Sequence, residues 1–91
     1  MKTFTWRPDK NLLLRSERGI SFEDALSCIS DDRLLDILIH PDQETYPGQK
    51  IFVILYHEYV YAIPFEETAT RIYLKTIFPS RKLTRHYLKR S

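Results

Sequence analysis

Two apolar β-type segments joined by a very short connection constrain the fold more than any other feature of the sequence. Residues 50–57 and 59–65 are rich in Ile, Val, Phe and Tyr, and only a turn near His57-Glu58 separates them. Such a turn joins antiparallel strands, whereas parallel strands need a crossover of about a dozen or more residues. The sequence therefore predicts a β-hairpin. Its turn lacks Asn-Gly or Asp-Gly, so the turn type stays open.

Three further β segments and three helices are expected around this hairpin. The strands are residues 3–6, 34–40 and 71–78, with a Pro-, Asp- and Gly-containing loop at 40–48. The helices are residues 8–17, 21–30 and 80–89.

Start and stop signals support the three helices. Pro8 fits a first helical turn and Gly19 a helix end, while Ser21 and Ser80 are good N-caps. Leu12, Leu13 and Leu14 are expected on the buried face of the first helix. The order β-α-α-β-β-β-β-α predicts one α+β domain over residues 1–91, with an antiparallel sheet and helices on one face.

Cysteine content and hydropathy indicate the compartment. Cys28 is the only cysteine, so no intramolecular disulfide can form, which fits a reducing cytosol. The longest apolar run, residues 51–56, is far shorter than the roughly 20 residues needed to span a bilayer. The first ten residues have no apolar signal-peptide core. We expect a cytoplasmic protein with no membrane partner.

Charge is distributed very unevenly along the chain. Residues 1–69 carry seven Lys or Arg and twelve Asp or Glu, a net charge of −5. Residues 70–91 carry seven Lys or Arg and no acid, a net charge of +7. Such separation predicts one face built for an anion, and nucleic acid, an acidic protein or an anionic membrane surface would all fit.

Strand alternation extends the basic segment into the expected sheet. In the last strand one face would carry Arg71, Tyr73, Lys75 and Ile77, and the helix-facing side Ile72, Leu74, Thr76 and Phe78. The preceding strand places four large side chains together: Tyr59, Tyr61, Ile63 and Phe65. If these lie beside the cations, the surface suits unpaired nucleic acid, because cations bind phosphates and rings stack on bases. Alternatively, the tyrosines only cover the sheet or a second core.

The expected C-terminal helix is amphipathic. At 100° per residue, Leu83, Thr84, Tyr87 and Leu88 share one arc, and the opposite side carries Arg81, Lys82, Arg85, His86 and Lys89. Leu83 and Tyr87 are expected to dock the helix. The cations point outward, where they either form a solvated face or bind an anion.

Other chemical motifs are absent from the sequence. His40, His57 and His86 are widely spaced and Cys28 stands alone, so no zinc motif is present. There is no glycine-rich phosphate loop. No metal ion or other cofactor is expected.

Three segments together resemble a known family. They are Phe4-Thr-Trp6, Gly19-Ile-Ser-Phe-Glu-Asp-Ala25 and Lys75-Thr-Ile-Phe-Pro-Ser-Arg-Lys-Leu-Thr-Arg85. Their order and spacing resemble the BrnT-type toxins of bacterial type II toxin–antitoxin systems. The resemblance covers nearly the whole chain. It departs from the family where Arg7 follows Trp6 in place of Asp, and where Arg18 precedes Gly19 in place of His.

The resemblance implies fold, activity and partners. The fold would be RelE-like, and the activity an endoribonuclease that halts translation. The partners would be RNA (mRNA, whether or not on the ribosome) and a cognate ribbon-helix-helix antitoxin. That antitoxin would neutralise the toxin and repress the shared operon, so operator DNA would be contacted only through the complex.

A metal-independent ribonuclease needs a base for the ribose 2′-OH, an acid for the leaving oxygen, and cations at the phosphate. Arginine suits the last task because its planar fork grips phosphate in two places. The candidates for phosphate stabilisation are Arg71, Arg81 and Arg85, supported by Lys75 and Lys82. The candidate proton carriers are His86 and Tyr61 or Tyr73, with Glu66 a poorer base. Further RNA contacts are expected from Lys82, Lys89, Tyr59 and Tyr73.

Two alternatives remain beside the ribonuclease. The chain could be a binding module that uses its basic face on RNA or an acidic partner without cutting. It could also be an inactive member whose basic face mainly holds the antitoxin.

Overall fold

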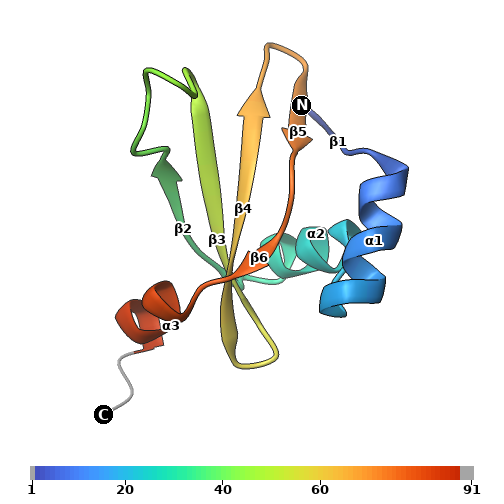
Figure 1. Ribbon diagram of the computed structural model, residues 1–91, viewed down its shortest axis with the longest axis vertical. Coiled ribbons are helices and arrows are strands. Elements are labelled where there is room, and N and C mark those ends of the chain that lie inside the picture. Colours follow the sequence, from blue (N-terminus) through green and yellow to red (C-terminus); the bar gives the residue numbers. More distant parts are fainter. Residues whose placement is uncertain (1, 89–91) are drawn as a thin grey trace.

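The computed structural model describes residues 2–88, which form six strands and three helices (Figure 1). In chain order these are β1 (Thr3–Thr5), α1 (Pro8–Arg18), α2 (Phe22–Ser30), β2 (Leu34–Ile39), β3 (Gln49–Tyr56), β4 (Tyr59–Glu67), β5 (Arg71–Leu74), β6 (Phe78–Pro79) and α3 (Arg81–Leu88). The α+β class and the order of the eight expected elements are confirmed, except that the last strand is divided in two. No helix among residues 2–88 combines the length and apolarity needed to cross a membrane.

The sheet is mixed rather than antiparallel. Its strand order is β1-β5-β4-β3-β2, and β6 also pairs with β4. All pairs are antiparallel except β1 with β5, which run parallel with Phe4 opposite Ile72. The expectation of an antiparallel sheet therefore fails at one edge. Two helices and three strands separate β1 from β5 in the chain, so no short turn fixes their relative direction.

The helix termini follow the local sequence. Pro8 occupies the first turn of α1, and Gly19 ends that helix at φ 67°, a left-handed conformation that glycine adopts easily. Ser21 and Asp24 form a capping box at the start of α2. Of the three leucines expected to be buried in α1, only Leu14 is; residues 12 and 13 are exposed. Consecutive residues lie 100° apart, so α1 buries positions 11 and 14 instead.

One face of the sheet forms the main core against α1 and α2. The core includes Phe52 and Ile54 of β3, Ile63 and Phe65 of β4, and Leu74 of β5. Leu14, Ile20, Phe22 and Ala25 pack against them from the helical side. This alternation on β3 and β4 follows directly from the apolar pattern of the predicted hairpin.

Pro64 accounts for the break in the last strand, which was expected to run unbroken over residues 71–78. Lys75 donates its backbone N–H to the Pro64 carbonyl (2.9 Å), so the Pro64 nitrogen faces the same edge. That nitrogen carries no hydrogen. The row of hydrogen bonds between β4 and β5 therefore lacks a donor at Pro64, where β5 ends. The alternation slips there, so that Ile77 is fully buried and Phe78 is exposed, the reverse of the expectation.

The third helix packs on the face of the sheet opposite α1 and α2, so the expectation of helices on one face is wrong. The second face is also apolar, because Val53, Val60 and Ala62 alternate with the main-core residues and are buried. The Ser80 N–H donates to the Val60 carbonyl (3.0 Å), which brings the start of α3 to β4. The helix then covers part of an apolar face that water would otherwise reach.

Candidate functional site

Ser80 and Thr84 fix the start of α3. Ser80 Oγ accepts from the Leu83 N–H (3.1 Å), confirming it as the helix cap. The Thr84 hydroxyl donates to the Ser80 carbonyl (2.7 Å) and accepts from the Val60 N–H (3.0 Å). The cap and the sheet contact therefore share one hydrogen-bonded chain. This arrangement holds an eight-residue helix that buries no residue fully.

Tyr87 fixes the other end of α3. Its hydroxyl donates to Asp36 Oδ2 on β2 (2.7 Å). This hydrogen bond, more than any other contact, lowers the pKa of the Asp36 carboxyl below its ordinary value, and the charge of nearby His86 adds to the effect. The same bond raises the pKa of Tyr87, because it holds the phenol proton. Asp36 is thus a carboxylate placed next to the basic helix.

The basic side of α3 faces solvent as the helical wheel predicts. Leu83, Thr84, Tyr87 and Leu88 are half-buried, whereas Arg81, Lys82, Arg85 and His86 are exposed. Every ion pair among residues 2–88 joins an acid to a Lys or Arg outside α3, and none includes Arg81, Lys82 or Arg85. His86 packs edge-on against the Tyr87 ring at 4.9 Å. The predicted contribution of Lys89 lies outside the described residues.

Lys75 is not a free cation. Its ammonium lies 2.7 Å from Glu66 Oε1, and the pair shares one face of the sheet. The Lys75 hydrogen bond is the main reason why the pKa of Glu66 is lowered, so this carboxyl is charged at neutral pH. Glu66 is therefore a weak base, and Lys75 brings little net charge to the surface.

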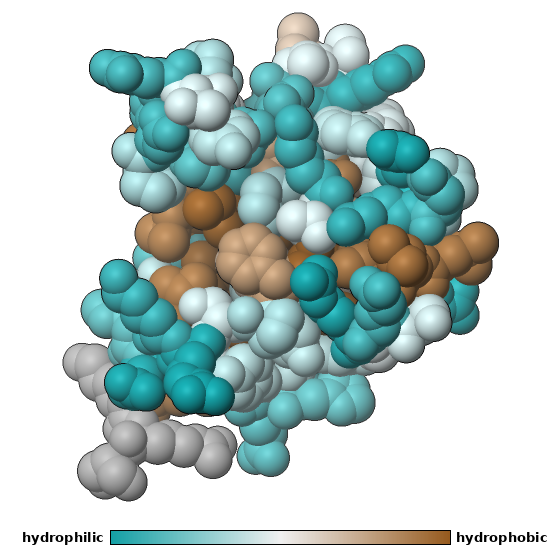
Figure 2. Space-filling model, in the orientation of Figure 1, coloured by the Kyte–Doolittle hydropathy of each residue, from teal (hydrophilic) through white to brown (hydrophobic). Residues whose placement is uncertain are grey.

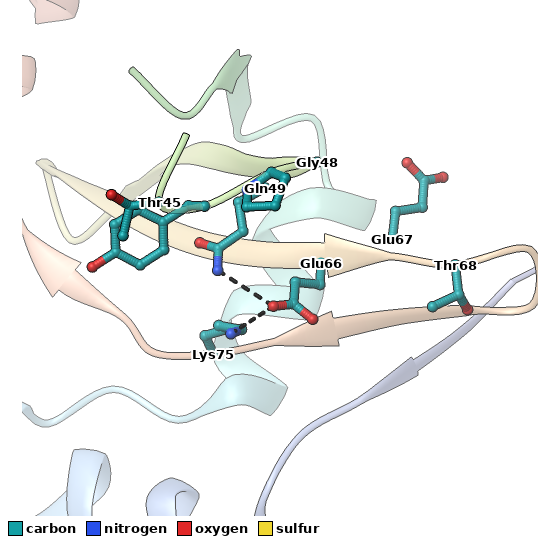
Figure 3. A pocket seen from close by; sticks show the side chains of 9 residues that line it. Thr45, Gly48, Gln49, Glu66, Glu67, Thr68 and Lys75 are labelled. Atoms are coloured by element: carbon teal, nitrogen blue, oxygen red, sulfur yellow. Dashed lines mark hydrogen bonds and ion pairs between the residues drawn. The ribbon is translucent and has the colours of Figure 1, made fainter. Parts of the chain in front are cut away.

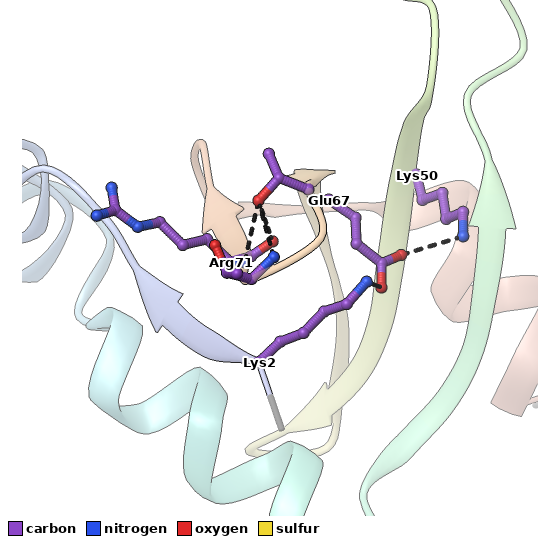
Figure 4. Close-up of polar contacts among 6 residues, drawn as sticks. Lys2, Lys50, Glu67 and Arg71 are labelled. Atoms are coloured by element: carbon purple, nitrogen blue, oxygen red, sulfur yellow. Dashed lines mark hydrogen bonds and ion pairs between the residues drawn. The ribbon is translucent and has the colours of Figure 1, made fainter.

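Arg71 lies at the far end of the sheet from α3 (Figure 1). Its side chain extends away from the cluster that Glu67 makes with Lys2 and Lys50 (Figure 4). From Val60 to Glu67, β4 rises by seven residue-to-residue steps, or about 23 Å at roughly 3.3 Å per step. Arg71 and the α3 arginines are too far apart to contact one phosphate. The expected continuous row of cations from Arg71 into the helix is wrong.

The tyrosines of β4 do not lie beside the cations of the last strand, which was the condition for a surface of cations and aromatics. Tyr61 pairs with Ile54, so it shares the main-core face with α1 and α2 and packs against that core. Tyr59 lies on the same face and contacts the Tyr61 ring edge-on at 6.0 Å. Tyr73 pairs with Glu66 on the opposite face. The tyrosines of β4 thus cover the sheet, which was the alternative interpretation of the pattern.

A band of apolar side chains crosses the α3 face of the sheet. Figure 2 shows it as a brown strip that runs from β2 and β3 past β6 to α1, between polar regions above and below. Exposed large apolar residues of β6 and α1 are Phe78, Leu12 and Leu13. The band lies between the exposed cations of α3 and the upper end of the sheet.

A polar cavity of about 370 Å³ opens at that upper end (Figure 3). Its lining comes from the loop before β3 and from the ends of β3, β4 and β5: Thr45, Tyr46, Pro47, Gly48, Gln49, Glu66, Glu67, Thr68 and Lys75. Gln49 is buried, and its amide nitrogen donates to the Glu66 oxygen that also binds Lys75 (3.4 Å). The cavity therefore has a fixed polar floor.

Two features of the site were not predicted from the sequence. Asp36 interrupts the apolar strand LLDILI, and an acid in such a strand is the signal that could have indicated it. Gln49 begins a strand that was expected to start one residue later, and nothing local distinguishes it. Both act through partners distant in sequence.

Comparisons with protein-family models, with curated proteins and with solved structures gave no match for this chain. The chemistry of the site therefore rests on its own geometry. Arg81, Lys82 and Arg85, which have no ion-pair partner within residues 2–88, can bind phosphate groups from one exposed helix. His86 lies among them, near the Asp36 carboxylate, and its imidazole can both donate and accept hydrogen bonds.

Proposed function

We propose that the chain is an endoribonuclease toxin that cleaves RNA without a metal ion and so inhibits translation. The observation that carries the proposal is the exposed row Arg81, Lys82 and Arg85, which has no ion-pair partner among the described residues. A basic helix whose only role is to face solvent is usually stabilised by acids three or four positions along it. The α3 sequence contains no acid. The resemblance of the flanking segments to BrnT-type toxins supports cleavage rather than binding alone.

The reaction follows from phosphodiester chemistry. The ribose 2′-oxygen loses its proton and bonds to the neighbouring phosphorus, and the bond from phosphorus to the 5′-oxygen breaks. The products are a 2′,3′-cyclic phosphate and a 5′-hydroxyl, which takes up one proton. Arg81 and Arg85 would stabilise the charge on the phosphorus oxygens, and His86 would carry a proton.

The proposed partners come from the same resemblance. A ribbon-helix-helix antitoxin would neutralise the toxin, and operator DNA would be reached only through that complex. A RelE-like fold is part of the proposal, and the small α+β architecture supports it. The apolar band beside α3 offers surface that an antitoxin could cover.

Inducible expression in a bacterial host tests this function. Wild type should arrest growth, and mapped RNA ends should show new 5′-hydroxyl termini. Arg81→Ala and Arg85→Ala should relieve the arrest while circular dichroism shows a folded protein. Arg15→Ala, which removes an exposed cation from α1, should leave the arrest intact. Full toxicity from both folded α3 variants would remove these residues from the site.

A second candidate is a module that binds RNA without cutting it. The specific observation in its favour is that Arg71 lies at the far end of the sheet and the Tyr61 side chain lies on the sheet face opposite α3, so His86 is the predicted proton carrier that remains on that helix. Purified protein that retards RNA at low salt but leaves it intact, alone and with ribosomes, would favour this candidate.

A further inference from the structure

The polar cavity at the upper end of the sheet presents an unusual combination of groups. Glu66 Oε1 accepts from both Lys75 Nζ (2.7 Å) and Gln49 Nε2 (3.4 Å). Figure 3 shows both nitrogens directed at this one oxygen. No hydrogen bond among residues 2–88 uses the other carboxylate oxygen, Oε2, or the side-chain amide oxygen of Gln49, Oε1. The cavity thus offers free acceptors beside an ammonium group that has further N–H donors.

This pattern matches one nucleobase. The pairing edge of guanine carries the O6 acceptor next to two donors, N1–H and N2–H, and no other RNA base presents that order. A carboxylate accepts the two donors and an ammonium donates to O6. The carboxylate is already held in place by Lys75 and Gln49, so little ordering is needed on binding.

The size and walls of the cavity suit a base. Its volume of about 370 Å³ lies at the small end of the range for ligand sites, roughly 300–1,000 Å³. Tyr46 lines it and is 42% exposed, so its ring is available for stacking. The Tyr46 ring also packs against the His40 ring, with 4.4 Å between the centroids and a tilt of 36°, which restricts its movement.

We propose that this cavity is a guanine-binding pocket in which Glu66 and Lys75 read the base and Tyr46 stacks on it. The inference rests on the proposed function for its RNA substrate: α3 holds the backbone, and the pocket selects a nucleotide some distance along the strand. Gln49 and Glu66 share the α3 face of the sheet, so one RNA strand can cross from the helix to the pocket. Guanine binding itself is measurable without any cleavage.

The test is titration of ¹⁵N-labelled protein with 5′-GMP, 5′-AMP, 5′-CMP and 5′-UMP, followed by NMR. The Gln49 side-chain amide and the Gly48 backbone amide should shift with GMP at one tenth or less of the concentration needed for the others. Inosine 5′-monophosphate, which lacks N2–H, should bind several-fold more weakly than GMP. Equal shifts with all four nucleotides, or shifts confined to α3, would overturn the proposal.

Variants identify the groups involved. Glu66→Gln keeps the size of the side chain but replaces one acceptor with a donor, so the GMP preference should fall at least tenfold. Glu17→Gln, an exposed acid on α1, should leave the preference unchanged. A Glu66→Gln variant that is folded by circular dichroism and still prefers GMP would contradict the assignment. Pocket amide signals that shift to saturation with free arginine but do not respond to GMP would also contradict it.

The outcome separates this inference from the proposed function. Growth arrest and RNA cleavage with no GMP preference would overturn the pocket and leave the toxin activity standing. A GMP preference without growth arrest or cleavage would uphold the pocket and remove the toxin activity. If both stand, mapped cleavage ends should be enriched in guanine at one fixed offset, and Glu66→Gln should abolish that enrichment.

Discussion

The Tyr87 hydroxyl and the Asp36 carboxylate join α3 to β2 through a hydrogen bond of 2.7 Å. The two residues are 51 positions apart in the chain. Together with the Thr84 contact to Val60, this bond attaches both ends of a short helix to the sheet. The position of the candidate phosphate-binding cations therefore depends on these two side-chain contacts, together with the backbone bond from Ser80 to Val60.

Tyr87→Phe tests the first contact through its pH dependence. The hydrogen bond holds the pKa of Asp36 below its ordinary value of 3.8. A carboxyl whose pKa is lowered by folding stabilises the native state above its unfolded pKa, and that stabilisation is lost as pH falls through the folded value. At pH 7 the variant should have a lower urea midpoint than wild type. The difference should shrink as the pH falls below 3.8.

The control is Tyr46→Phe, which removes a hydroxyl from an exposed tyrosine in the loop before β3. It should show no such pH-dependent difference from wild type. A gap between wild type and Tyr87→Phe that is the same at pH 7 and at low pH would separate Tyr87 from the charge of Asp36.

Thr84→Val tests the second contact. The substitution keeps the shape of the side chain but removes the acceptor for the Val60 N–H, which lies in a fully buried residue. An unpaired buried donor costs about 1–3 kcal/mol, so the free energy of unfolding should fall by that amount. Thr84→Ser keeps the hydroxyl and should lose less. Equal losses from the two variants in urea unfolding would show that the methyl group, and not the hydrogen bond, matters.

Asn11 connects the first two helices and gives a third prediction. Its side chain accepts from the Phe22 N–H (2.7 Å) and donates to Glu23 (2.7 Å) while being 7% exposed. Asn11→Leu leaves the Phe22 donor unpaired and should reduce the free energy of unfolding by about 1–3 kcal/mol.

Asn11→Asp keeps the acceptor for Phe22 but sets a second carboxylate against Glu23, whose pKa is lowered chiefly by the Asn11 hydrogen bond in wild type. Repulsion between the carboxylates should raise their pKa values, so this variant should be least stable at neutral pH and recover as the pH is lowered. A stability profile parallel to that of wild type between pH 7 and pH 4 would contradict this account of the bridge.

The hairpin turn between β3 and β4 gives a fourth prediction. His57 and Glu58 both have positive φ, 50° and 62°, which non-glycine residues rarely adopt. Asparagine tolerates this conformation better at the first position of such a turn. His57→Asn should raise the free energy of unfolding by about 0.5 kcal/mol. His57→Ala should not, and stabilisation by alanine would show that loss of the His57 ring, rather than backbone strain, is responsible.

The local sequence predicts most elements because their signals are local. Pro8, Gly19, Ser21 and Ser80 mark helix ends, and the apolar alternation of the hairpin specifies its core face. Pro64 also gives a local signal for the break in the last strand, because a proline within a strand removes a hydrogen-bond donor. To use that signal, one must know which edge of β4 the last strand pairs with.

The arrangement of the site was predicted only in part, because it depends on contacts between distant residues. The α3 wheel correctly separates docked from exposed side chains. The sequence pattern leaves open which face of the sheet each helix covers, and the choice made for Tyr59 and Tyr61 was wrong. The pairing of Lys75 with Glu66 follows from the register of β4 and β5, which a pattern along one strand does not contain.

The central claim is that the exposed cations of α3 bind the RNA backbone, and its most direct test is the salt dependence of RNA affinity. For a single strand, each phosphate contact contributes about 0.7 to the slope of log K against log salt concentration. Arg81→Ala and Arg85→Ala should each reduce the magnitude of the slope for a labelled single-stranded RNA by about 0.7, and Arg15→Ala should not change it. Slopes for both folded α3 variants equal to that of wild type would contradict the account.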